Sequence, residues 1–258
     1  MPKQPEIELE LLPLRFHGET YWHRCDSPND LDIKVCNFFR SKEIEKGFYI
    51  ECGANNGIFQ SNTFLLEQAG WTGILIEADP QLAYNCSNYR ENNIVQNAAL
   101  VSSKYVGSTV EGLFSKYYSK DYREMNDLAK DLNDTERKDF FGEIYQACLT
   151  GQIIHDAEDR SDKIPEHLIK KEVPAATLFS ILQTYNIKPW AIDFFSLDVE
   201  GMELDVLDGL NLQYYRPKYI LVEILEDEKK SEIESLMRDN KYEEIANFSN
   251  HDIMYEAQ

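Results

Sequence analysis

Short apolar runs alternate with stretches of helical character over most of this chain. The apolar runs cover 47–52, 73–77, 93–100, 191–201 and 219–224, and helices are expected over 60–70, 80–90, 175–185, 202–210 and 228–239. Continuous apolar strands separated by helices are typical of a parallel sheet that is covered on both faces. Two last strand-like runs, YEEIAN and DIMYEA, predict a closing hairpin. We therefore predict an α/β fold, a doubly wound Rossmann-like sheet of about seven strands. Its ligand should lie at the carboxyl ends of the strands, where the strand order reverses.

Two segments depart from this rhythm. Residues 1–31 show no clear periodicity, so we expect an irregular N-terminal arm ahead of a domain that spans 32–258. Residues 101–172 are polar and Tyr-rich. Helical spacing from Val110 to Tyr118 and a second helical stretch over 138–150 predict a helical insertion between the third and fourth strands. Because the insertion follows the third strand beside the expected pocket, we interpret it as a lid.

The charge of the chain limits its partners. Its 46 acidic residues against 26 Lys and Arg give a formal charge of −20. Such a chain repels nucleic acid and anionic membranes, so a small-molecule partner is expected. The five cysteines lack metal-ligand spacing and fit reduced thiols. The chain shows neither a secretory apolar core near its N-terminus nor a run of roughly 20 apolar residues. We expect a cytoplasmic protein, and its oligomeric state stays open.

The first candidate site is the turn ECGANNG, residues 51–57, at the end of the first strand. Gly53 and Gly57 allow a tight turn and the close approach of a ligand. Their spacing is not the GxGxxG of dinucleotide-binding turns. A carboxylate at Glu51 suits an amino or other cationic group and would repel a pyrophosphate. The alternative is an ordinary strand-to-helix turn.

The second candidate site follows the next strand. Glu77 lies 20 residues past Gly57, close to the offset at which an acid accepts hydrogen bonds from ribose hydroxyls. The alternative is a helix cap, a task that Asp79 can fill alone. Asn97 in the third strand is a candidate contact to the edge of an adenine, or else a satisfied buried amide.

The third candidate is the acid pair Asp198 and Glu200 after the fourth strand. Carboxylates there could bind a metal, accept a proton or orient a second substrate. Glu203, in the next helix, also fits a position that stabilises the helix dipole. Glu223 is either a site acid or a satisfied strand end. His155, in the charged part of the insertion, is a weaker candidate base. Since the chain has no ligand spacing typical of metal centres, no metal site is predicted.

The blocks ECGAN-G, SNT, W-G-L-IEADP, NAAL and LDVEG-E together resemble the FkbM-type S-adenosylmethionine-dependent methyltransferases, over about 47–100 and 175–256. The resemblance implies the class I methyltransferase sheet. It implies that Glu77 binds the ribose diol of the cofactor, and that Asp198 and Glu200 face the transferred methyl group and the acceptor. Asn56 stands where the family often has Asp. The cofactor-binding residues implied are Glu51, Gly53, Ala54, Asn55, Gly57, Glu77, Ala78, Asn97 and Asp198.

The resemblance predicts O-methylation of a hydroxyl on a sugar or secondary metabolite by in-line transfer from S-adenosylmethionine. Asp198, then Glu200, is the expected base, and the insertion is expected to bind a neutral or cationic acceptor. Three alternatives stay open. The first two are a carboxylate O-methyltransferase and a nicotinamide-dependent oxidoreductase. The third is a non-catalytic binding or trafficking protein on a methyltransferase fold, since the SNT and IEADP blocks also resemble animal Star proteins.

Overall fold

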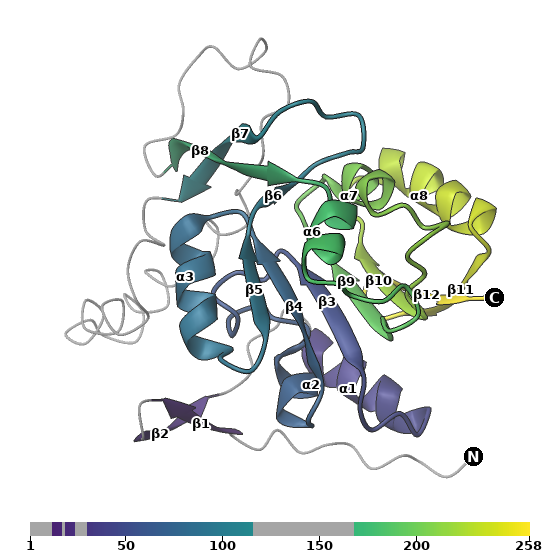
Figure 1. Cartoon of the computed structure of the whole chain (residues 1–258). Coiled ribbons are helices and arrows are strands. Elements are labelled where there is room, and N and C mark those ends of the chain that lie inside the picture. Colours follow the sequence, from purple (N-terminus) through teal and green to yellow (C-terminus); the bar gives the residue numbers. More distant parts are fainter. Residues whose placement is uncertain (1–11, 17–18, 24–29, 116–167) are drawn as a thin grey trace.

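The computed structural model describes residues 12–16, 19–23, 30–115 and 168–258. Its centre is a seven-stranded sheet in the order β11-β12-β10-β9-β3-β4-β5 (Figure 1). The strands are β3 (Phe48–Cys52), β4 (Thr72–Glu77), β5 (Ile94–Asn97), β9 (Phe194–Leu197), β10 (Tyr219–Glu223), β11 (Tyr242–Asn247) and β12 (Asp252–Ala257). The pairs that join β5, β4, β3, β9 and β10 are parallel, and β12 pairs antiparallel with β10 and β11. The predicted doubly wound sheet of seven strands is confirmed.

Helices cover both faces of this sheet. They are α1 (Leu31–Ser41), α2 (Phe64–Gln68), α3 (Pro80–Tyr89), α6 (Leu178–Thr184), α7 (Glu203–Leu210) and α8 (Asp227–Asp239). Alternate residues of β3 divide the core: Ile50 and Cys52 pack with α6, α7 and α8, whereas Tyr49 packs with α1, α2 and α3. The alternation follows from the two-residue period of a strand. None of the described helices is long and apolar enough to cross a membrane.

The strand order reverses between β3 and β9. From β3 the chain adds β4 and then β5 on one side, and it returns to place β9 and β10 on the other. Neighbouring connections therefore diverge above the carboxyl ends of β3 and β9, which is where ligands of doubly wound sheets bind. Residues 51–57 follow β3 into this point, and Asp198 follows β9.

A second, three-stranded sheet has the order β6-β8-β7 and consists of β6 (Ala99–Leu100), β7 (Thr109–Ser115) and β8 (Leu168–Ala176). It lies at the end of the main sheet where the chain leaves β5 (Figure 1). The predicted third strand, 93–100, is thus split between two sheets. The predicted helix over 175–185 begins only at Leu178, because Ala175 and Ala176 pair with β6 and the Thr177 hydroxyl caps α6.

The helical spacing near residue 110 was misleading. Residues 109–115 form β7, which pairs antiparallel with β8, so the described ends of the predicted helical insertion are a β-hairpin. Val110 and Phe114 share one buried cluster, as their spacing of four requires in a strand as well as in a helix. Two apolar residues four positions apart fit both the 3.6-residue period of a helix and the two-residue period of a strand. The predicted helix at 138–150 lies outside the described residues.

The N-terminal arm also differs from the prediction. Where 1–31 was expected to be irregular, β1 (Leu12–Phe16) and β2 (Glu19–His23) form an antiparallel pair, with Phe16 opposite Glu19. Two five-residue strands are too short to produce a periodicity that stands out from chance. The helix α1 begins at Leu31, close to the predicted start of the domain.

Candidate functional site

The turn after β3 touches the end of β9 without an intervening side chain. Gly53 has φ +81°, and a Cβ there would lie 1.8 Å from the carbonyl oxygen of Asp198. Only glycine fits such a position, because the left-handed conformation and the lack of space exclude other residues. The Asp198 N–H donates to the Cys52 carbonyl at 3.2 Å, so the two strand ends remain paired up to this point. Gly53 thus brings the first and third candidate sites together.

The backbone N–H groups of the turn 53–59 all donate to acceptors within the protein. The N–H groups of Gly53 and Ala54 both donate to the Ile76 carbonyl, and that of Asn55 donates to Glu77 Oε2 at 2.8 Å. The next four donors, at residues 56–59, go to Asn55 Oδ1, the Ala54 carbonyl and Asn56 Oδ1. A phosphate-binding turn needs N–H groups that point at the ligand. All seven N–H groups here have acceptors within the protein, so this turn is not a pyrophosphate cradle.

The residue that departs from the family pattern has a clear task. Asn56 Oδ1 accepts hydrogen bonds from the N–H groups of Ile58 at 3.0 Å and Phe59 at 2.8 Å. Asn and Asp side chains both close turns of this kind, because each offers an acceptor oxygen at the same short distance, three bonds from Cα. Asn in place of Asp therefore keeps the turn.

Glu51 is buried in the protein interior. Its side chain is 2% exposed and accepts hydrogen bonds from the Ser61 and Thr63 hydroxyls and from the Asn62 N–H, at 2.6 to 3.0 Å. Burial raises the pKa of Glu51, and the Arg90 guanidinium 3.8 Å away acts in the opposite direction. These three donors engage both oxygens of the carboxylate, which has about four acceptor sites in all. The structure gives Glu51 the role of holding residues 61–63, in place of the predicted direct contact to an amino group.

Arg90, at the end of α3, is a residue that sequence reasoning missed. It is fully buried, forms an ion pair with Glu67, and donates to the Gly57 carbonyl at 2.7 Å and to Tyr49 Oη at 2.6 Å. It also donates to the hydroxyls of Ser61 and Thr63, both at 3.0 Å. In the sequence it stands in the polar run NYRENN, which is typical of an exposed helix end. No local pattern separates it from a surface arginine.

Gly57 is part of the buried network around Arg90. It has φ +85°, and a Cβ there would lie 2.7 Å from Cys86 Sγ and 2.8 Å from Arg90 Cγ. The glycine therefore lets the turn pack against α3. The geometry does not favour the predicted role of Gly57 in direct cofactor binding. The Gly57 carbonyl accepts from Arg90, and the space where a Cβ would stand is occupied by Cys86 and Arg90.

Glu77, at the end of β4, keeps acceptor capacity. One carboxylate oxygen accepts the Asn55 N–H and the other accepts the Asp79 N–H, each at 2.8 Å. The Ala78 backbone also interacts with this carboxylate, and since a carboxylate has about four lone-pair sites, capacity for one further hydrogen bond remains, such as one from a ribose hydroxyl. Burial raises the pKa of Glu77 to about 7. Asn97 fixes the neighbouring backbone, because its amide donates to the carbonyls of Glu77 and Ala78, both at 2.9 Å.

Three acids meet at the carboxyl ends of β9 and β10. Asp198, Glu200 and Glu223 each place a carboxylate oxygen within 4.8 Å of the others. Burial raises the pKa of Asp198 well above its usual range, and the negative charge of the adjacent Glu223 raises it further. Burial also raises the pKa of Glu200 to about 8. The site therefore includes Glu223, for which the sequence left two interpretations open.

Glu203 and His155 stand apart from this acid cluster. Glu203 is 2% exposed, and its Oε1 accepts the N–H groups of Gly201 at 2.9 Å and of Val199 at 3.4 Å, so it closes the turn between β9 and α7. His155 lies outside the described residues. The prediction that the protein has no metal site stays a prediction, because carboxylate oxygens grouped as in Asp198, Glu200 and Glu223 are also the ligands of hard divalent cations.

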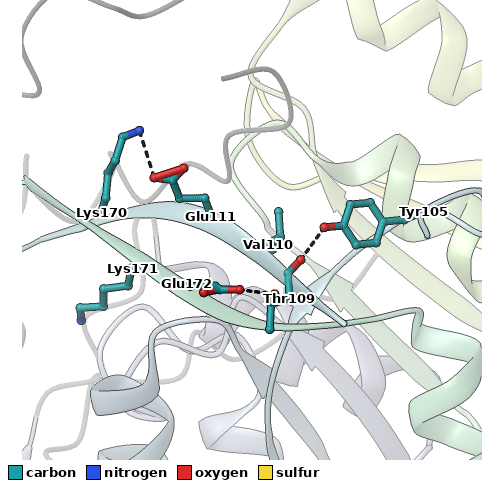
Figure 2. Close-up of a pocket in the computed structure, with 7 residues that line it drawn as sticks. All are labelled: Tyr105, Thr109, Val110, Glu111, Lys170, Lys171 and Glu172. Carbon is teal, nitrogen blue, oxygen red and sulfur yellow. Dashed lines mark hydrogen bonds and ion pairs between the residues drawn. The ribbon is translucent and has the colours of Figure 1, made fainter. Parts of the chain in front are cut away.

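A cavity of about 440 Å³ lies on the β7–β8 hairpin (Figure 2). Three of its charged residues have partners within the hairpin, Lys170 with Glu111 at 3.0 Å and Glu172 with Thr109, whereas Lys171 pairs with Asp79 outside it. Tyr105 Oη donates to the Thr109 carbonyl at 2.5 Å and closes one end. None of the predicted site residues lines this cavity. The lining residues are Tyr105, Thr109, Val110, Glu111, Lys170, Lys171 and Glu172.

Three of the solved structures that are similar to this chain have low TM-scores. A protein of Pyrococcus horikoshii assigned as an RNA methyltransferase is 7% identical with TM-score 0.40, covering 91% of this chain and 87% of its own. A SAM-dependent methyltransferase of Aquifex aeolicus is 9% identical with TM-score 0.37, covering 90% and 93%. The human methyltransferase 10 domain containing protein is 10% identical with TM-score 0.37, covering 88% and 82%. At these TM-scores the likenesses carry no argument about function.

The family is shown by a different comparison. No curated protein sequence matches the chain significantly. The model of the methyltransferase FkbM domain matches residues 51–244, which is well over half of the chain. The match begins at the buried acid Glu51 and includes Glu77 and the acids that follow β9 and β10. The protein therefore belongs to the FkbM family of methyltransferases.

Proposed function

We propose that this protein transfers a methyl group from S-adenosylmethionine to a hydroxyl oxygen of a neutral or cationic small molecule, such as a sugar or secondary metabolite. The observation that carries the proposal is the cluster of Asp198, Glu200 and Glu223 at the strand reversal, directly beside the Gly53 turn, with carboxylate oxygens within 4.8 Å of one another. Carboxyl groups this close do not all ionise together, and an ionised member of the cluster can take a proton from an adjacent hydroxyl.

The residues at the strand reversal suit the cofactor. Glu77 retains acceptor capacity for a ribose hydroxyl. The turn 53–59 has no unused N–H group for a phosphate, and this cofactor has no phosphate. The acids Asp198, Glu200 and Glu223 complement a ligand that carries an ammonium and a sulfonium. When bound, the sulfonium supplies an already activated methyl group, so the protein has mainly to align the acceptor with it.

Asp198 and Glu223 would act on the acceptor side. A hydroxyl is a weak nucleophile until its proton is removed, and a positioned base in a partly desolvated site removes it during attack. Burial raises the pKa of both acids, and neighbouring carboxylates add to it: Glu223 raises the pKa of Asp198, and Asp252 raises that of Glu223. Both acids are therefore stronger bases than exposed carboxylates. Glu200, with its pKa near 8, stands within reach of the same proton.

Two of the alternatives fit this site less well. A carboxylate acceptor would have to lie beside three acids, and the repulsion would weaken its binding. A nicotinamide dinucleotide would need donors for its pyrophosphate, and residues 53–59 offer none. A non-catalytic binding protein on this fold keeps the same cofactor residues, so only an assay separates it from an enzyme.

The assay is methyl transfer from tritiated S-adenosylmethionine to a panel of hydroxylated and carboxylated small molecules, with wild type and Asp198→Asn. Asparagine keeps the size of the side chain, but it cannot take a proton. We expect Asp198→Asn to lower turnover about 100-fold to 10,000-fold at saturating S-adenosylmethionine, a loss in the chemical step that weaker cofactor binding alone would not cause. Full turnover by Asp198→Asn would refute the assignment of the base. Cofactor binding without transfer to any acceptor would favour the non-catalytic alternative.

A further inference from the structure

The β7–β8 hairpin packs against the segment that contains Glu77, the acid proposed to bind the ribose. A small apolar cluster on its underside contains Val110, Phe114 and Val173, and Ala78 packs against it. Ala78 is the residue between Glu77 and Asp79, directly after β4. The hairpin is also tied to the chain beyond β5, because the Val101 N–H donates to the Ala176 carbonyl at 3.1 Å. The hairpin and the edge of the proposed cofactor site therefore form one packed unit.

One ion pair joins the two parts. Lys171 Nζ, on β8, lies 2.6 Å from Asp79 Oδ2, with the aspartate side chain 3% exposed and the lysine side chain 25% exposed. The same ammonium lies 5.4 Å from the centroid of the Phe114 ring, which limits its freedom on the other side. A half-buried pair held in this way is screened less than a surface pair.

The neighbouring lysine provides a contrast. Lys170 and Lys171 point to opposite sides of β8 (Figure 2). Lys170 pairs with Glu111 at 3.0 Å, with both side chains 43% exposed. Pairs exposed to that degree contribute little. The two lysines carry the same charge and lie on the same strand, but only Lys171 reaches the proposed cofactor site.

The position of Asp79 determines the orientation of the Glu77 carboxylate. Its Oδ1 caps α3 by accepting the N–H groups of Gln81 at 2.7 Å and Leu82 at 3.3 Å. Its own backbone N–H donates to Glu77 Oε1 at 2.8 Å. A shift of Asp79 therefore moves the hydrogen bond that sets the orientation of the Glu77 carboxylate.

We propose that Lys171 is a positioning residue for the cofactor: through its ion pair with Asp79 it fixes Glu77, and so the β7–β8 hairpin becomes part of the cofactor site. This inference rests on the proposed function, because it assigns Glu77 to the ribose. It adds to that function a residue on the inserted hairpin, which the family motifs do not include.

The test is calorimetric titration of full-length protein with S-adenosylhomocysteine and, separately, with adenosine. We expect Lys171→Met to raise both dissociation constants about fivefold to tenfold, since the effect acts at the ribose. Lys171→Arg, which can keep the pair, should stay within about twofold of wild type, and so should the matched control Lys170→Met. Equal affinities for Lys171→Met and Lys170→Met would overturn the inference, and so would a failure of Lys171→Arg to restore binding.

Asp79→Asn removes the charge of the partner and keeps a good helix cap. It should weaken binding by the same factor as Lys171→Met, and the double variant should be no weaker than either. Additive losses would contradict the ion-pair mechanism. If Lys171→Met folds poorly, Asp79→Asn alone decides the matter, and unchanged affinity in that variant would overturn the inference. If wild type itself does not bind S-adenosylhomocysteine, the proposed function fails. If wild type binds and Lys171→Met binds equally, only the role of Lys171 fails.

Discussion

Replacing Gly53 by alanine should separate the two strand ends on which the site depends. At φ +81° a residue other than glycine costs about 1–2 kcal/mol. The new Cβ would also lie 1.8 Å from the Asp198 carbonyl oxygen, whereas real Cβ atoms essentially never come within 3.0 Å of such an atom. Relieving that overlap requires a movement of β3 against β9, and overpacking of this kind costs about 1–3 kcal/mol. The expected loss in the free energy of unfolding is therefore about 2–5 kcal/mol.

Gly70→Ala is the matched control for this substitution. Gly70 has φ +94°, but the nearest atom to an added Cβ is the flexible Lys46 Cε at 3.6 Å. Its loss should therefore be the backbone part alone, about 1–2 kcal/mol. Urea denaturation measures both values. Gly53→Ala should in addition weaken the binding of S-adenosylhomocysteine, while Gly70→Ala should not. Equal losses of stability with unchanged affinity in both variants would refute the close contact between Gly53 and Asp198.

The remaining predictions concern the buried charges. Arg90→Met leaves Glu51 buried without its cation, and we expect it to lower the free energy of unfolding by about 3–5 kcal/mol in urea denaturation. The double variant with Glu51→Gln should lose less than the sum of the two single losses, and strict additivity would argue against the network. In the folded protein the pKa of Glu77 is about 7 and that of Glu200 about 8, against 4.5 ordinarily. The folded state therefore binds more protons than the unfolded state between these values, so stability should fall as pH rises from about 4.5 to about 8. Methyl transfer should show the opposite trend and rise with pH through this range, because the base must be deprotonated, and a rate that falls would contradict the assignment.

The sheet could be predicted because its strands are apolar throughout and its helices follow at regular intervals. Buried parallel strands leave this mark directly in the sequence. The acid at the end of β4 could be placed for a similar reason, since its offset from the glycine turn reflects the length of one helix and one strand. The start of the insertion was mistaken for a helix, because Val110 and Phe114 share a face in both helix and strand.

The direction in which a polar side chain points could not be predicted. Glu51 and Glu77 both stand at strand ends, and the alternation of residues along a strand turns Glu51 toward Arg90. Glu51 and Arg90 are 39 residues apart in the sequence, and the residues next to each of them give no sign of the pairing. The cluster of Asp198 with Glu223 likewise forms only because β9 and β10 are neighbours in the sheet. Predicting partners of this kind requires the strand order and the register, which short motifs do not contain.

The central claim is that the strand reversal between β3 and β9 binds S-adenosylmethionine and no dinucleotide. The most direct measurement is calorimetric titration of wild type and Glu77→Gln with S-adenosylhomocysteine and with NAD. We predict saturable binding of S-adenosylhomocysteine at one site per chain, clearly weaker in Glu77→Gln, and no binding of NAD. Absence of S-adenosylhomocysteine binding in wild type, or binding of NAD at a site that Glu77→Gln weakens, would contradict the claim.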